Sequence, residues 1–274
     1  MKLQDLLDSP VALPPMPRVV SLLLAELDLD EPDIRKVNEL MMFDPVLTAR
    51  LLQLSNSAQF QLPKRIGSVR EALSLLGVTL VKNLVTVAAL GSSFRTIPGM
   101  DMTQFWLYCL NVSKVSSVLA SIVKISVPMS YTAGLIHAMG ELVLHLGQVP
   151  QIVQLDASVS VFDPSRAGAE RSLLGYSYAE VGAGFARAWQ FPQAIVEGLE
   201  HQDRPFEDEV YEPLSGVLHL AAWRARVLEM GFSGAEMVDN FPDVVALALE
   251  IDIEMVMECD PLEWTSRQEV AVFS

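Results

Sequence analysis

Cysteine and positive charge are both scarce in this sequence. Only two cysteines, Cys109 and Cys259, occur among 274 residues, which is too few for a disulfide framework and favours a reducing compartment. Nineteen lysine and arginine residues stand against 34 aspartate and glutamate residues, and the formal net charge is −15. The basic residues are scattered singly, so an acidic surface should repel phosphate backbones, and nucleic acid is not an expected partner.

A secretion signal and a long uninterrupted apolar run are missing as well. The N-terminal sequence MKLQDLLDSP reaches acidic residues at once and lacks the apolar core of a signal peptide. The most apolar stretch, 73–91, is interrupted by Lys82 and Asn83, whereas a membrane span needs about 20 mostly apolar residues. These absences predict a cytoplasmic protein without a membrane span.

Alternating, strand-like patterns are nearly absent, and only ASVSVF at 157–162 is a candidate strand. Helical periodicity dominates instead, as in the stripe that runs from Tyr108 to Ile122. Asp44-Pro45 predicts a helix start and Gly77 a helix end. Further helices are predicted at 178–190, 192–202, 210–230 and 243–258.

The two long helical patterns around residues 91–101 are separated by glycine, serine and proline. We therefore predict an all-α protein with two helical subdomains, residues 1–95 and residues 96–274. Hydrophobic residues make up 51% of the chain and the mean hydropathy is +0.32. Both values favour much buried surface, or an apolar patch that is reserved for a partner.

Common catalytic motifs are missing too. The sequence has no G-x-S-x-G, no H-E-x-x-H, no P-loop, and no G-x-G-x-x-G between a strand and a helix. Cys109 lies beside the apolar stripe that begins at Tyr108, which is typical of a buried, inert thiol. Nothing in these patterns indicates an enzyme, and no cofactor is expected.

The stretch GLIHAMGE, residues 134–141, is the one place where a metal site could be considered. On one continuous helix, His137, Glu141 and His145 would share a face opposite an apolar stripe. His137 and His145 would then lie about 12 Å apart along the axis, too far to bind one ion. His137 and Glu141 supply only two ligands, so the residues alone favour a solvated or cleft-facing polar stripe over a metal site.

Seven sequence segments, taken in order, resemble the HDOD family of bacterial signalling modules, which are related to the HD-type metal phosphohydrolases. The resemblance covers nearly the whole chain, from about residue 10 to 260. The segments are LPPMPRVVSLLLAEL, DPVLTARLLQLSNSAQF, IGSVREALSLLGVTLVKNLV, FWLYCLNVSKVSSVLA, YTAGLIHAMGELVL, LLGYSYAEVGAGFARAWQFPQAIVEGLEHQ and LSGVLHLAAWRA.

The resemblance implies that most of the metal ligands of catalytic HD proteins have been replaced. Those proteins use a histidine on the first long helix, an adjacent His-Asp pair, further histidines and a late aspartate. The corresponding positions here are Tyr108, His137-Ala138, Tyr178, Glu200-His201 and Ala222. His137 and His201 are retained, but the carboxylates that would bridge and charge-balance the metals are not, and a hydrolytic centre needs such ligands.

The resemblance therefore implies a non-catalytic, stand-alone signalling or scaffold protein whose partners act in trans. Signalling proteins of the receiver or cyclic-dinucleotide type are the expected partners, and a homodimer is left open. His137, Glu141 and His201 are the candidate contact surface.

Two alternatives stay open. The degenerate cavity could bind a small molecule such as a cyclic dinucleotide, with Arg166, Arg171 and Arg187 as the nearest candidates for a phosphate contact. A residual metal phosphohydrolase is less favoured.

Overall fold

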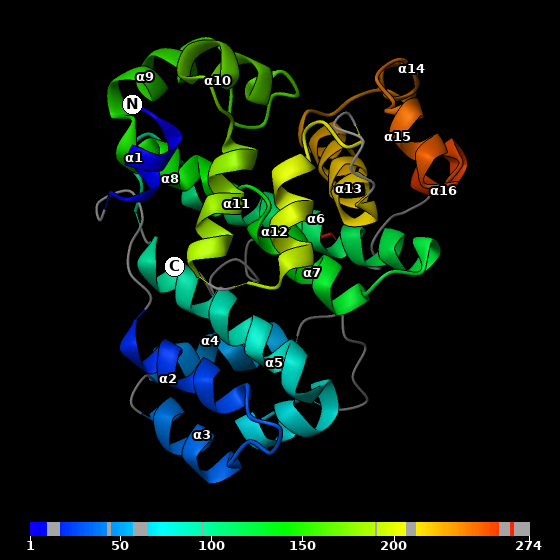
Figure 1. Ribbon diagram of the computed structural model, residues 1–274. Helices are drawn as coiled ribbons and strands as arrows, with labels where there is room; N and C mark the ends of the chain where they lie inside the picture. Colours follow the sequence, from blue (N-terminus) through cyan, green and yellow to red (C-terminus); the bar gives the residue numbers. More distant parts are fainter. Residues whose placement is uncertain are drawn as a thin grey trace. The chain divides into compact units, whose positions relative to one another are not determined.

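The computed structural model describes residues 1–9, 17–42, 45–56, 65–94, 96–189, 191–206, 212–257 and 264–265 (Figure 1). Every regular element in these ranges is a helix, which confirms the all-α prediction, and the candidate strand at 157–162 consists mostly of turns and bends. The helices are α1 (Leu3–Leu7), α2 (Arg18–Leu27), α3 (Ile34–Met42), α4 (Pro45–Ser55), α5 (Val69–Ser93), α6 (Met102–Val123), α7 (Val127–Ile136), α8 (Met139–Gly147), α9 (Val149–Asp156), α10 (Arg166–Leu174), α11 (Tyr178–Ala188), α12 (Gln193–His201), α13 (Pro213–Glu229), α14 (Gly234–Asp239), α15 (Asp243–Ala248) and α16 (Ile253–Met257).

The helices form two compact units. The smaller unit contains α2 to α5, and the larger unit contains α6 to α16 together with α1. The predicted first subdomain, residues 1–95, included α1, and the structure differs on this point. Leu6 of α1 is buried, the Leu7 side chain fills the space that a Cβ on Gly184 of α11 would occupy, and the Tyr176 hydroxyl donates to the Met1 carbonyl at 3.3 Å.

In the smaller unit, α4 and α2 pack against the long helix α5. Gly77 interrupts α5 with φ 78° and ψ 164°, a conformation that side-chain-bearing residues rarely adopt, so the predicted helix end is a kink between two helical segments. The predicted start at Asp44-Pro45 is only half described, because α4 begins at Pro45 whereas Asp44 lies outside the described residues.

In the larger unit, α6 packs against α7 and α13, and α11 packs against α8 and α12. The carboxylate of Asp101 caps α6 by accepting from the backbone N–H groups of Thr103 (2.9 Å) and Gln104 (3.1 Å). The predicted helix at 243–258 is two short helices, α15 and α16, because the chain turns at Glu250, which has a left-handed φ of 56°.

Two helical stretches, Val69–Ala89 and Met102–Val123, are long and apolar enough to cross a membrane by length and composition. In their most apolar windows, 61% and 72% of the residues are buried inside the protein. Burial of this extent is typical of core helices in soluble proteins, so the two stretches are weak evidence for a membrane span.

Two glycines allow neighbouring helices to approach closely. A Cβ on Gly140 of α8 would lie 1.9 Å from the Tyr178 carbonyl oxygen and 2.8 Å from the Gly182 nitrogen of α11. A Cβ on Gly134 of α7 would lie 2.6 Å from the Ser113 Cα of α6. Since the obstacles are backbone atoms, no side-chain rearrangement could relieve these collisions.

Replacing Gly140 by alanine should therefore destabilise the fold. We expect Gly140→Ala to lower the free energy of unfolding by about 1–3 kcal/mol or more, because α8 and α11 must separate. The matched control is Gly168→Ala on α10, where no described atom lies within 4 Å of the added Cβ. Urea unfolding measures both, and equal stability of the Gly140→Ala and wild-type proteins would contradict the close approach.

Candidate functional site

The stretch 134–141 is not one continuous helix. Helix α7 ends at Ile136 and α8 begins at Met139, with Ala138 in a non-helical conformation (φ −101°, ψ 10°). His137 lies in this break, where its Nδ1–H donates to the Gly134 carbonyl (2.8 Å) and its own carbonyl accepts from Gln202 Nε2 (2.9 Å).

The predicted polar stripe is wrong, because His137, Glu141 and His145 are all buried. His137 has no exposed surface and Glu141 has almost none, so neither side chain can form the expected contact surface. His201, at the end of α12, is the only one of the three predicted surface residues that is partly exposed.

The structure brings several of the predicted positions together. The Tyr108 ring from α6 packs edge-on against the His137 ring, with 4.9 Å between centroids, and against Phe162 at 5.2 Å. Tyr178 lies close to this group, because the Tyr178 hydroxyl and the Tyr108 ring both face Arg226. Tyr108 is thus a core aromatic, as its place on a helical stripe suggests.

Glu200 lies apart from this group. Its carboxylate is more than a third exposed and pairs with Arg187 at 3.1 Å on the surface. Ala138 lies in the helix break beside His137, and Ala222, on α13, lines the same cavity as Tyr178.

Sequence reasoning missed Arg226. Its Nη2 lies 3.4 Å from the Tyr178 hydroxyl, and its guanidinium carbon lies 5.9 Å from the centre of the Tyr108 ring. The available signal was that Arg226 follows Ala222 by four residues, so that both face the same side of α13.

These residues do not fit a metal ion. Of the positions that the resemblance aligns with metal ligands, only His137 and His201 are histidines, whereas Tyr108 and Tyr178 present phenol rings and Ala138 and Ala222 present methyl groups. The Arg226 guanidinium, itself a cation, lies beside the two tyrosines. Within the described residues, no group of three or more histidine, cysteine, aspartate or glutamate side chains could hold a metal.

Burial dominates the electrostatics of the cluster. It lowers the pKa of His137 to about 3, and the positive charge of Arg226 acts in the same direction. His137 Nε2 has no hydrogen-bond partner among the described residues, consistent with a neutral ring whose proton is on Nδ1. Burial also raises the pKa of Tyr108 to about 12.

Burial raises the pKa of the Cys109 thiol as well, so that Cys109 is the unreactive, buried residue that the sequence predicted. Cys259 lies outside the described residues.

Arg166, a predicted phosphate contact, is fully buried and is used for structure. Its guanidinium donates to Glu170 Oε1 (2.8 Å), Asp156 Oδ1 (2.8 Å), the Val159 carbonyl (2.8 Å) and Glu141 Oε2 (3.2 Å). Desolvation and the neighbouring Glu170 raise the pKa of Glu141 well above its usual value. These carboxyl groups account for the Arg166 charge, so it is not available to a ligand.

A small cavity of about 150 Å³ lies in the larger unit beside Tyr178. Its lining combines charged, polar and small residues: Pro164, Ala167, Gly168, Arg171, Tyr178, Gln202, Asp203, Arg204, His219, Ala222 and Arg226. Arg171 pairs there with Asp203 at 2.5 Å and with Glu180 at 3.3 Å. Of the three predicted phosphate contacts, only Arg171 lines this cavity.

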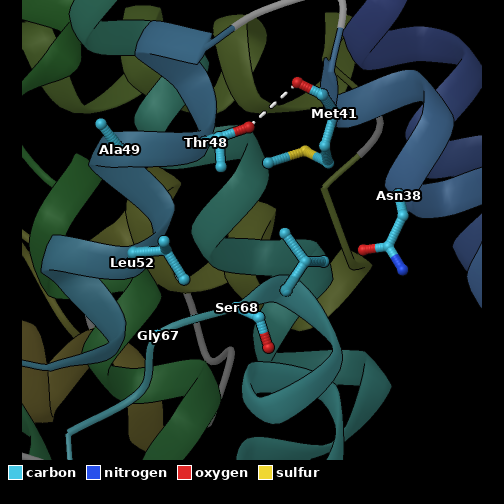
Figure 2. A pocket seen from close by; sticks show the side chains of 8 residues that line it. Asn38, Met41, Thr48, Ala49, Leu52, Gly67 and Ser68 are labelled. Atoms are coloured by element: carbon cyan, nitrogen blue, oxygen red, sulfur yellow. Dashed lines mark hydrogen bonds between the residues drawn. The ribbon is translucent and has the colours of Figure 1, made fainter.

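A larger hollow of about 630 Å³ lies in the smaller unit and has a different character (Figure 2). It is lined by Asn38, Met41, Thr48, Ala49, Leu52, Gly67, Ser68 and Val69. The Thr48 hydroxyl donates to the Met41 carbonyl at 2.9 Å, which leaves Asn38 and Ser68 as the other polar side chains of the lining. With no charged residue among the described residues of its lining, this hollow suits an apolar group and not an anion.

The described helices define an all-α domain as the class of fold. Within this class, the HDOD domain model matches residues 13–205, which is more than half of the chain. The chain therefore belongs to the HDOD family, as the order of its motifs predicted.

Two solved structures share the fold. A "Putative phosphohydrolase" from Shewanella amazonensis SB2B is 24% identical, with a TM-score of 0.80 over 99% of this chain and 98% of that one. A "Putative signal transduction protein" from Marinobacter aquaeolei VT8 is 22% identical, with a TM-score of 0.65 over 99% of this chain and 58% of that one. At these identities, the likeness establishes the fold alone.

Among curated proteins, an uncharacterized protein from Treponema pallidum (strain Nichols) is 24% identical over 211 residues. The match covers 73% of this chain and 40% of the relative, so this chain spans well under half of that relative's length.

The neutral, buried state of His137 predicts a loss of stability in mild acid. In the unfolded chain this histidine gains a proton near pH 6.5, whereas in the folded protein it does so near pH 3, so stability falls as pH drops below about 6.5. By about pH 5 the loss from this residue is about 2 kcal/mol.

His137→Asn should remove this contribution, because an amide does not titrate. Urea unfolding of both proteins between about pH 7.5 and about pH 5 measures the difference, and His219, whose pKa burial also lowers, accounts for part of the remaining slope. An identical pH dependence in the two proteins would show that His137 is not held neutral.

Proposed function

We propose that this protein is a non-catalytic HDOD signalling or scaffold protein that acts in the cytoplasm through protein–protein contacts. The proposal is supported by the side chains at the positions that the resemblance aligns with metal ligands, namely Tyr108, Ala138, Tyr178 and Ala222, and by the Arg226 guanidinium beside the two tyrosines. Metal-dependent hydrolysis needs several ligands for each ion and an open coordination position for water. A fixed cation among phenol rings and methyl groups supplies neither.

Elemental analysis distinguishes the proposed function from its rival, residual metal phosphohydrolase activity, which requires bound metal. We expect protein produced with added manganese, iron and zinc to contain well below one equivalent of each metal by elemental analysis. We also expect no chelator-sensitive hydrolysis of phosphate monoesters. A stoichiometric metal together with such activity would overturn the proposal.

The surface that best suits a protein partner is on α15. Val244 and Leu247, three residues apart and thus on one face, are 80% and 79% exposed; we name them the α15 patch. Val238 of α14 and Met255 of α16 are exposed as well. Isolated exposed apolar residues are common, but such a group on consecutive short helices is typical of an interaction site.

The charges around the α15 patch indicate the kind of partner. Residues 231–257 contain six carboxylate side chains and neither lysine nor arginine: Glu236, Asp239, Asp243, Glu250, Asp252 and Glu254. An exposed apolar pair in a segment whose charged residues are all acidic is complementary to an amphipathic segment that has apolar anchors and basic flanks. We propose that a signalling protein of the receiver or cyclic-dinucleotide type presents such a segment in trans.

The alternative of a cyclic-dinucleotide sensor is less well supported. Pockets that enclose drug-sized ligands have volumes of about 300–1,000 Å³, whereas the cavity at the degenerate site has about 150 Å³. A cyclic dinucleotide would remain mostly outside it.

Disrupting the α15 patch should abolish partner binding without unfolding the protein. We expect the double variant Val244→Glu, Leu247→Glu to lose, in affinity purification from the native cell, the partner that the wild-type chain retains, and to bind the purified partner at least about 10-fold more weakly. The control is Val153→Glu on α9, since Val153 is also exposed (62%) but lies on another helix.

Sedimentation of the purified chain distinguishes self-association through the α15 patch from binding of a different protein. If the wild-type chain is a concentration-dependent dimer that the double variant disrupts, the patch binds a second copy and the hetero-partner is wrong. If the wild-type chain, the double variant and Val153→Glu all retain the same partner equally, the partner does not bind at the α15 patch.

A further inference from the structure

Arg226 has far more hydrogen-bonding capacity than its neighbours use. A guanidinium carries five N–H donors, yet within the described part of the chain Arg226 donates only to the Tyr178 hydroxyl, at 3.4 Å. Its Nε–H is buried without a described partner. Among the described carboxylates, Asp163, whose pKa is lowered mainly by its hydrogen bonds with Ser165, is also near enough for the Arg226 charge to lower that pKa, but Asp163 and Arg226 form no ion pair. A cation this poorly neutralised inside a protein favours an anion beside it.

The 150 Å³ cavity next to Arg226 concentrates positive charge. Arg171, Arg204 and Arg226 line it, while Asp203 is the only carboxylate among the described residues of its lining. Asp203 and Glu180 neutralise Arg171 in part, but the Arg171 Nε–H is also buried without a partner among the described residues. In a chain whose net charge is −15, a site lined by three guanidinium groups is exceptional.

The same cavity also offers hydrogen-bond acceptors. His219 donates its Nδ1–H to the Gln202 carbonyl at 2.8 Å, so its Nε2 carries a free electron pair. Asp203 Oδ1 and Gln202 Oε1 are buried without partners in the described structure. A ligand for this lining therefore needs several acceptor oxygens for the arginines and at least one O–H to donate.

We propose that this cavity binds a single phosphate-type oxyanion, held by Arg226 and Arg171 and donating its P–OH to Asp203 or His219. Hydrogen phosphate and a singly protonated phosphate monoester have both acceptor oxygens and an O–H. Sulfate has the same shape but no proton at neutral pH, so the acceptors discriminate against it. The volume admits the phosphate group, whereas the rest of an ester would lie outside.

The site shares Tyr178, Ala222 and Arg226 with the cluster on which the non-catalytic assignment rests, but it shares no residue with the α15 patch. The α15 patch lies on another helix and contributes none of the lining residues, so partner binding and phosphate binding can succeed or fail separately.

Isothermal titration calorimetry of the purified full chain tests the proposal, with orthophosphate, a nucleoside monophosphate and sulfate compared at constant ionic strength. We expect either phosphate ligand to bind at least about 10-fold more tightly than sulfate. Arg226→Met should weaken phosphate binding at least about 10-fold, because it removes charge-assisted hydrogen bonds. The control Arg187→Met removes the same charge from the surface and should leave binding unchanged.

A second variant keeps the test valid if Arg226→Met does not fold. Gly168 lines the cavity, and no described atom lies within 4 Å of a Cβ added to it, so Gly168→Leu should fold and obstruct the site. We expect it, too, to weaken phosphate binding at least about 10-fold.

Tighter binding of orthophosphate would identify the ligand as the free ion, and tighter binding of the monophosphate would identify it as a small phosphate ester. Absence of binding by both would overturn the proposal. Sulfate and phosphate binding equally well, with no effect of Gly168→Leu, would overturn it as well.

Discussion

The Arg166 guanidinium carries a positive charge that is completely removed from water, and the larger unit depends on how that charge is compensated. Removing an ion from water costs several kcal/mol, which only well-placed partners can offset. Arg166 finds them on three helices, at Glu141 of α8, Asp156 of α9 and Glu170 of its own α10. Loss of the arginine would leave buried carboxyl groups without their cation, so these helices stabilise one another as a group.

The same network positions the degenerate site. Glu170, which binds Arg166 through one oxygen, accepts from the Tyr178 backbone N–H through the other at 2.6 Å, at the first residue of α11. Tyr178 in turn meets Arg226. The two arginines thus differ in a simple way: carboxyl groups surround Arg166, whereas phenol rings surround Arg226. Carboxyl groups neutralise the Arg166 charge within the fold. The Arg226 charge is the one that we propose for anion binding at the cavity.

Helix positions could be predicted from sequence, because apolar periodicity and the punctuation by Gly77 and the prolines are local signals. The break between Ile136 and Met139 could not, since Ala138 is neither a helix breaker nor a good cap, and the contacts that fix it come from Gln202. Of the positions that the resemblance named, Tyr108, His137 and Tyr178 lie together, whereas Glu200 lies apart. Arg226 was missed because the resemblance named only metal-ligand positions, although its spacing of four residues from Ala222 on α13 placed it on the same helix face.

The attachment of α1 to the larger unit has a consequence for the covalent topology of the chain. Because α1 belongs with α6 to α16, helices α2 to α5 of the smaller unit lie between two parts of the larger unit in the sequence. No single cut can release one unit intact from the other. A fragment that starts after residue 96 would lack Leu7, leaving a gap over Gly184, and would deprive the Tyr176 hydroxyl of its carbonyl acceptor.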